Sequence, residues 1–180
     1  GYVSNQPFYL DEKNIKYNIF NPKDFGFDFY GDMIFSSKEF VQNNIKDIKV
    51  FLPSGTGTTA LFLQKYLPFE VLTCPCVGDE EYLKKQFEVL EKKNHPLILK
   101  IDKKYHFGKL YKEFYEIHNN LLTQTNIEFD LLYDSLGWIC FENFVKQLKE
   151  ANTTFLYIHQ GGIIGNESMY DRYKHKYPLI

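Results

Sequence analysis

The sequence predicts an α/β domain in which helices cover both faces of a parallel sheet. The first supporting observation is a series of short apolar stretches along residues 45–180. The second is that segments with apolar residues at helical spacing separate these stretches. The third is composition: 180 residues, of which 44% are hydrophobic, suffice for one buried core. Strands that alternate with helices are joined by right-handed crossovers, so we expect the strands to run parallel.

Each expected strand is a short apolar run bounded by polar or turn residues. In chain order they are 48–52 (IKVFL), 69–74 (FEVLTC), 97–101 (LILKI), 129–133 (FDLLY) and 154–159 (TFLYIH). Each segment between them is long enough for a helix, and the expected helices are 58–67, 79–94, 109–122 and 137–150. Asp79 stands at the start of the second helix, where its side chain can cap the first turn.

Residues 1–44 have a different character from the rest of the chain. They are rich in aromatic residues, and the stretch 21–32 (NPKDFGFDFYGD) is interrupted by proline and glycine. Such a mixture is typical of loops rather than of a periodic element. We therefore expect two parts: an irregular N-terminal segment, 1–44, that packs on an α/β domain formed by 45–180.

Charge and cysteine content exclude several classes of partner. A net charge of −2 without a basic stripe argues against nucleic acid. No apolar run approaches the roughly 20 residues that span a membrane. Three cysteines, Cys74, Cys76 and Cys140, cannot build a disulfide framework and indicate the reducing cytoplasm.

The loop 54–59 (SGTGTT) joins the first expected strand to the first helix. The first N–H groups of a helix have no acceptor within the helix, and the helix dipole favours a negative group beside them. Glycine lets the backbone approach a ligand, and hydroxyls add donors. The loop therefore predicts an anion site, and the simpler alternative is a small polar turn.

Two other chemistries fit parts of the pattern less well. The letters G-x-G-x-x-A also match a dinucleotide fingerprint, which requires an acid at the tip of the second strand, where this chain has Cys74–Pro75–Cys76. Two thiols with His95 as the nearest further ligand are too few for a metal centre. Buried core cysteines are the better interpretation, and we expect no metal.

Two further strand ends carry more than turn residues. Tyr133 and Asp134 close the fourth expected strand, and His159 precedes Gly161 and Gly162 after the last one. The carboxyl ends of parallel strands form the ligand-binding edge of such sheets, so these residues are expected near the loop 54–59. The alternatives are that Asp134 caps the next helix and that His159 belongs to the core.

The motifs SGTGTTA, DLLYDSLGW and FLYIHQGG, in this order on expected strand ends, resemble one family. It is the pyridoxal-phosphate-dependent 1-aminocyclopropane-1-carboxylate deaminase and D-cysteine desulfhydrase family, which has a tryptophan-synthase-β-like fold (fold type II). The resemblance covers most of residues 20–166 and corresponds to the C-terminal part of such enzymes.

The resemblance implies a role for each motif residue. Asp134 would face the pyridine nitrogen of pyridoxal 5′-phosphate and favour its protonated form, and Tyr133 would contact cofactor or substrate. His159, Gly161 and Gly162 would line the substrate site. The residues that would bind the cofactor phosphate are Gly55, Thr56, Gly57, Thr58 and Thr59.

The family lysine that forms a Schiff base with the cofactor has no counterpart in this sequence. The only comparable stretch, 43–49 (NNIKDIK), runs directly into the first strand. The deaminases' tyrosine before a glycine is also replaced, by Phe107 before Gly108. We therefore expect the lysine outside this chain, and the chain alone to be inactive.

The function that the resemblance implies is a lyase or hydrolase of amino acid metabolism. It would deaminate or desulfhydrate a small amino acid, in the cytoplasm, as a possible homodimer. Two alternatives stay open: a non-catalytic domain that binds a phosphate-bearing ligand, and a dinucleotide-binding oxidoreductase domain.

Overall fold

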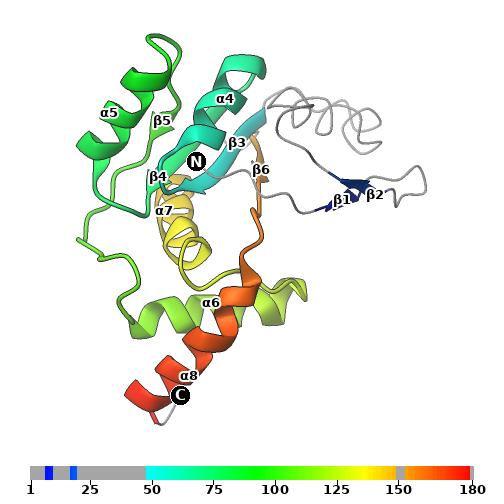
Figure 1. Cartoon of the computed structure of the whole chain (residues 1–180), viewed down its shortest axis with the longest axis vertical. Helices are drawn as coiled ribbons and strands as arrows, with labels where there is room; N and C mark the ends of the chain where they lie inside the picture. Colours follow the sequence, from blue (N-terminus) through cyan, green and yellow to red (C-terminus); the bar gives the residue numbers. More distant parts are fainter. Residues whose placement is uncertain (1–6, 10–16, 20–47, 149–152, 179–180) are drawn as a thin grey trace.

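The structure is a computed structural model that describes residues 7–9, 17–19, 48–148 and 153–178. Its centre is a four-stranded sheet in the order β5-β4-β3-β6, and every neighbouring pair is parallel (Figure 1). The strands are β3 (Ile48–Ser54), β4 (Glu70–Pro75), β5 (Leu97–Ile98) and β6 (Thr154–Tyr157). The predicted α/β parallel architecture is confirmed.

Helices follow the strands, as expected. They are α4 (Thr58–Tyr66), α5 (Glu80–Leu90), α6 (Lys112–Thr125), α7 (Asp134–Gln147), the short 3-10 helix η1 (Ile163–Gly165) and α8 (Asn166–Lys176). Asp79 caps α5 as predicted, since its side chain accepts the Tyr82 N–H at 2.9 Å. The last helix was not anticipated from the sequence. None of the helices in the described part of the chain is both long and apolar enough to cross a membrane.

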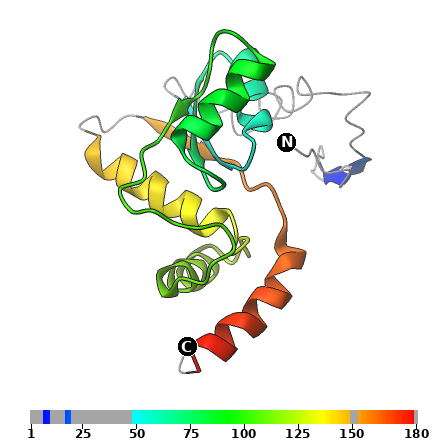
Figure 2. The same cartoon turned by 60° about the vertical axis from the view of Figure 1, so that its left-hand side comes forward.

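The two faces of the sheet are covered by different helices. Val50 and Leu52 of β3 are fully buried against Leu63 and its neighbours on α4. Phe51, between them in sequence, points to the opposite face and packs with Leu136 of α7. The two views show α4 and α5 on one side of the sheet and α7 on the other (Figures 1 and 2). Helices on both faces are therefore confirmed.

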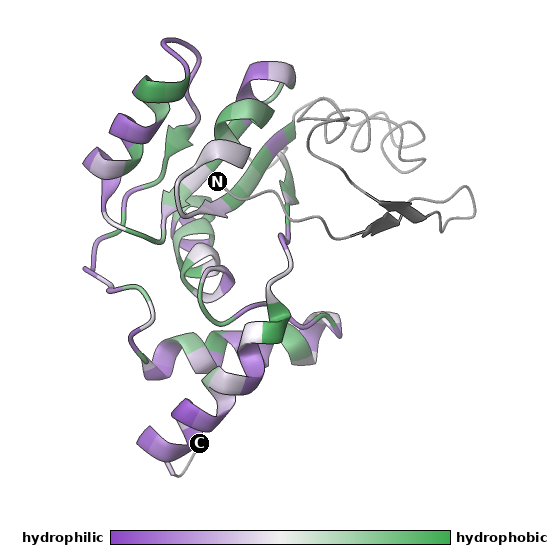
Figure 3. Cartoon of the chain, in the orientation of Figure 1, coloured by the Kyte–Doolittle hydropathy of each residue, from purple (hydrophilic) through white to green (hydrophobic). Residues whose placement is uncertain are grey.

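The hydropathy of the residues agrees with the burial of the strands. The strands of the sheet are largely hydrophobic, whereas α8 is largely hydrophilic (Figure 3). Helix α7 approaches β3 and β6 closely at Gly137, where a Cβ would lie 2.9 Å from Pro53 and from the Tyr157 hydroxyl. This close approach brings the first turn of α7 to the carboxyl edge of the sheet.

The predicted strand 129–133 is wrong. Its backbone groups bond side chains instead of a neighbouring strand: the Leu131 N–H donates to Asn166 Oδ1 at 2.9 Å, and Asn166 Nδ2 donates to the Phe129 carbonyl at 2.9 Å. Asp130 then turns the chain into α7, which begins at Asp134, three residues before the expected start. An apolar run packed under α8 has the composition of a strand without its pairing.

Two other boundaries differ from the expected ones. The third strand shortens to Leu97–Ile98, and α6 begins at Lys112, later than expected. The predicted irregular segment 1–44 lies almost entirely outside the described residues. Within it, β1 (Pro7–Tyr9) and β2 (Tyr17–Ile19) form an antiparallel pair.

Candidate functional site

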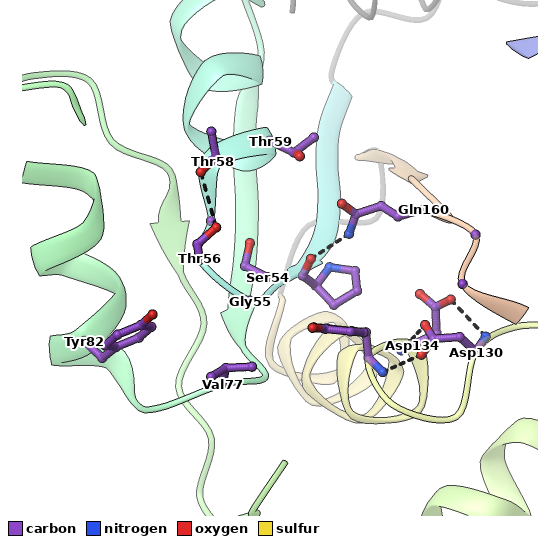
Figure 4. Close-up of a pocket in the computed structure, with 15 residues that line it drawn as sticks. Ser54, Gly55, Thr56, Thr58, Thr59, Val77, Tyr82, Asp130, Asp134 and Gln160 are labelled. Atoms are coloured by element: carbon purple, nitrogen blue, oxygen red, sulfur yellow. Dashed lines mark hydrogen bonds between the residues drawn. The ribbon is translucent and has the colours of Figure 1, made fainter. Parts of the chain in front are cut away.

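A cavity of about 560 Å³ opens at the carboxyl ends of β3, β4 and β6. The loop that enters α4 forms one wall, and the start of α7 forms the other (Figure 4). Its lining residues are Pro53, Ser54, Gly55, Thr56, Gly57, Thr58, Thr59, Val77, Tyr82, Asp130, Tyr133, Asp134, Gln160, Gly161 and Gly162. Most of the residues singled out in the sequence thus lie around one cavity of a size suited to a small ligand.

The wall at α4 is the N-terminus of a helix. Gly57 precedes the helix with φ +77, and no side chain caps the helix. The first helical hydrogen bond runs from the Leu61 N–H to the Gly57 carbonyl at 2.9 Å, so the amides before Leu61 precede the helical ladder. The Thr56 and Thr58 hydroxyls lie 3.3 Å apart beside them. This arrangement of amides and hydroxyls suits an anion.

The two glycines of the loop have different surroundings. A Cβ on Gly57 would lie 2.4 Å from the Phe87 ring and 2.6 Å from Leu83, both on α5. A Cβ on Gly55 would lie 3.5 Å from the Tyr133 ring, which is an ordinary contact. Gly57 therefore serves the packing of α4 against α5, and Gly55 borders the cavity next to Tyr133.

The base of the loop is fixed by the sheet. The Thr73 hydroxyl donates to the Leu52 carbonyl at 2.8 Å, and the Ser54 hydroxyl lies 2.6 Å from Thr73 Oγ1. On the other side, the Gln160 amide nitrogen Nε2 donates to the Pro53 carbonyl at 2.7 Å. The loop therefore begins from a backbone held on both flanks.

The opposite wall carries a buried carboxylate with two side-chain donors. Asp134 is 1% exposed, and its Oδ1 accepts the Tyr157 hydroxyl at 2.9 Å. Its Oδ2 accepts His159 Nδ1 at 2.7 Å. The hydrogen bond to Asp134 raises the pKa of His159, and burial, together with the Asp134 charge, raises the pKa of Tyr157. The expected alternative, in which Asp134 caps its own helix, is wrong.

Asp130 performs the capping instead. Its Oδ1 accepts the N–H groups of Leu132 and Tyr133 at 2.7 and 2.8 Å, and its Oδ2 accepts the Asp134 N–H at 3.2 Å. Burial and the neighbouring Asp134 raise the pKa of Asp130 to about 7. The cavity wall therefore holds two adjacent carboxyl groups, of which Asp130 keeps its proton more readily than an ordinary aspartate does.

Asp130→Asn is expected to flatten the dependence of stability on pH between about 4 and about 7. The pKa of Asp130 rises on folding from its ordinary 3.8 to about 7. The folded chain thus retains a proton that the unfolded chain releases. The contribution of this proton to stability is fully present below pH 3.8 and is lost as the pH rises to about 7. Asparagine stays neutral and keeps a side-chain acceptor for the capped N–H groups. Urea unfolding over this pH range measures the difference, and parallel curves for the two proteins would contradict it.

Sequence reasoning missed part of the site, and it did not foresee the contact between His159 and Asp134. Among the described residues, His159 is not one of those that line the cavity: its ring bonds Asp134 and meets the edge of Phe129, with ring centroids 4.9 Å apart. The next residue, Gln160, lines the cavity; the sequence placed it in the same strand end but gave it no role of its own. Asp130 was also missed, although an aspartate four residues before Asp134 and just before a helix is a recognisable cap signal.

Cysteine and lysine side chains contribute little to this cavity. Cys74, Cys76 and Cys140 are buried free thiols, as the core interpretation predicted. No cluster of ligands suited to a metal ion occurs among the described residues. No lysine of that part of the chain lines the cavity. Lys103, which follows β5, pairs with Glu113 at 2.6 Å, and Lys109 lies over the Tyr111 ring.

Three comparisons with known proteins bear on this site. A family model described as NMT1/THI5 like matches residues 1–61, a segment that includes β3 and the loop into α4. No curated protein matches the chain in sequence. A solved structure titled as that of an ACC deaminase homologue is similar to it, with a TM-score of 0.56 and 16% identity.

The likeness to the solved structure covers 81% of this chain and 48% of the other, so this chain spans about half the length of that protein. At 16% identity the likeness concerns the fold alone. The expected resemblance is therefore supported at the level of architecture: the chain has the α/β fold, with a parallel sheet between helices, of part of an ACC deaminase homologue.

Proposed function

We propose that the cavity binds pyridoxal 5′-phosphate and that the chain is part of an enzyme that deaminates or desulfhydrates a small amino acid. The observation that carries the proposal is that an uncapped helix start at 55–59 and the carboxylate of Asp134 line the same cavity. This ligand has a phosphate at one end and a ring nitrogen at the other. The likeness to the ACC deaminase homologue supports the same ligand class.

The residues present fit the two ends of this cofactor. The phosphate would lie against the backbone of Gly55, Thr56, Gly57, Thr58 and Thr59, where amides and hydroxyls converge. Tyr133 would flank the ring, since its own ring borders Gly55. Asp134 would hold a proton on the ring nitrogen through Oδ1, which accepts the Tyr157 hydroxyl and can accept a second hydrogen bond. Its Oδ2 already accepts both His159 Nδ1 and the Asp130 N–H.

The bound cofactor would supply an electron sink for the carbanion formed at the substrate Cα. The chain's own contribution is to orient the ring, to keep its nitrogen protonated and to retain the phosphate. The covalent lysine would come from outside the described residues, none of whose lysines lines the cavity. By the same resemblance we propose a cytoplasmic homodimer, and the three buried free thiols agree with a reducing compartment.

The phosphate end is tested with two ligands that cannot form a covalent bond to lysine. Pyridoxine 5′-phosphate is expected to bind the chain about a hundredfold more tightly than pyridoxine, since two charge-assisted hydrogen bonds contribute about 3 kcal/mol. Titration calorimetry measures both affinities. Equal affinities would contradict the proposed cofactor site.

A non-catalytic domain for a phosphate-bearing ligand is the second candidate. The match of residues 1–61 to a different family favours it, as does the lack of a lysine at the described cavity wall. Such a domain would bind phenyl phosphate, which lacks the ring nitrogen, as tightly as pyridoxine 5′-phosphate. A marked preference for the pyridine ring favours the cofactor site instead.

A further inference from the structure

We propose that His159 is a positioning residue whose protonation state sets how strongly Asp134 holds a positively charged ring nitrogen in the cavity. The inference deepens the proposed function and rests on it, because it requires the ligand's ring nitrogen to face Asp134. It concerns a residue that the sequence placed in the substrate site and that the structure places against Asp134, outside the cavity lining.

Two side chains donate hydrogen bonds to different oxygens of the Asp134 carboxylate. His159 Nδ1 contacts Oδ2 at 2.7 Å, and the Tyr157 hydroxyl contacts Oδ1 at 2.9 Å. Asp134 itself lines the cavity. Two donors thus fix the orientation of both oxygens, so that a ligand meets a carboxylate that is already held in place.

The two donors differ in charge. Burial and Asp134 raise the pKa of Tyr157, so the phenol stays neutral at ordinary pH. His159 is half-buried, with a side chain 27% exposed, and can exchange its proton with water. The hydrogen bond to Asp134 raises its pKa, and the charge of Asp130 acts in the same direction. His159 is therefore the group in this cluster that gains a positive charge as the pH falls towards mild acidity.

The consequence concerns the net charge that a ligand meets. With His159 neutral, neither of the described side chains that bond Asp134 carries a positive charge. The negative charge of Asp134 then attracts a cationic ring nitrogen. With His159 protonated, the imidazolium next to Asp134 offsets that charge. Asp130 is the other ionisable group that faces this pair, from the turn before α7. A ligand with a cationic ring nitrogen should thus lose affinity when His159 gains its proton.

The test compares two probes that share a phosphate: pyridoxine 5′-phosphate, and phenyl phosphate without a ring nitrogen. Their ratio of affinities removes the titration of the phosphate and reports on the ring end alone. In the wild-type chain the preference for pyridoxine 5′-phosphate is expected to fall about tenfold from about pH 8 to about pH 5.5. In His159→Asn, whose amide nitrogen replaces Nδ1 without a titrating charge, the preference should fall by less than in the wild-type chain. The fall that remains belongs to Asp130, whose pKa of about 7 lies in the same range. His175→Asn, at an exposed position of α8, is the matched control and should behave as wild type.

A preference with the same pH profile in wild type and His159→Asn would overturn the inference and leave the proposed function standing. No preference for the pyridine ring at any pH would overturn both. If a variant does not fold, NMR titration of His159 in the wild-type chain tests the inference without a ligand. Its midpoint is expected above the ordinary value of about 6.5, and a midpoint at or below that value would also overturn the inference.

Discussion

Gly57→Val is expected to lower the free energy of unfolding by about 2–5 kcal/mol. The residue has φ +77, a region in which a β-branched side chain is strained, and a Cβ would lie 2.4 Å from Phe87 and 2.6 Å from Leu83. The first effect strains the loop backbone, and the second pushes α4 away from α5. Urea denaturation of the purified chain measures the loss.

Gly55→Ala is the matched control from the same loop. Its Cβ would meet the Tyr133 ring at 3.5 Å, an ordinary contact, so its stability should stay within about 1 kcal/mol of wild type. Comparable losses in the two variants would contradict the packing role of Gly57. The sequence analysis gave the loop glycines one use, the close approach of the backbone to a ligand. At Gly57 the structure adds a packing reason, because a side chain there would point at α5.

Asp134→Ala is expected to cost about 3 kcal/mol of stability, because it leaves two buried or half-buried donors without their acceptor. Those donors are the Tyr157 hydroxyl and His159 Nδ1. Tyr157→Phe removes only one of the two hydrogen bonds and should cost about 1 kcal/mol. Thermal or urea unfolding of both variants provides the comparison, and an Asp134→Ala chain as stable as Tyr157→Phe would contradict the account.

This result also changes how the catalytic role of Asp134 is tested. In a full-length enzyme, a loss of turnover in Asp134→Ala would combine a loss of ring protonation with a disturbed wall. Asp134→Asn keeps the shape and part of the hydrogen bonding, so the electrostatic effect can be separated from the structural one.

The elements that could be predicted from the sequence are those that a local pattern of residues specifies. The buried strands β3 and β4 and the cap at Asp79 have unambiguous local patterns, and the structure reproduces them. The run 129–133 failed because an apolar pentapeptide does not specify its partner. Asn166, 35 residues away from Leu131, takes the N–H that a neighbouring strand would need.

In the site, too, features set by local sequence could be predicted and features set by distant residues could not. The position of the loop 54–59 at the cavity wall could be predicted, because the loop directly follows a buried strand and the carboxyl ends of parallel strands meet at one edge of the sheet. The relation of His159 to Asp134 could not be found, because it depends on the close approach of α7 to the sheet at Gly137. Gln160 bonds the Pro53 carbonyl across a separation of 107 residues, which no local pattern encodes.

The central claim is that the start of α4 binds the phosphate of a ligand, and backbone amide NMR tests it most directly. On addition of inorganic phosphate, at an ionic strength matched with chloride, the largest shift changes are expected for the amides of 55–60, with small changes elsewhere in the described residues. The changes should saturate and should be reproduced by pyridoxine 5′-phosphate, which should also shift the amides of Tyr133 and Asp134. Unchanged amides at 55–60, or shifts confined to surface lysines, would contradict the account.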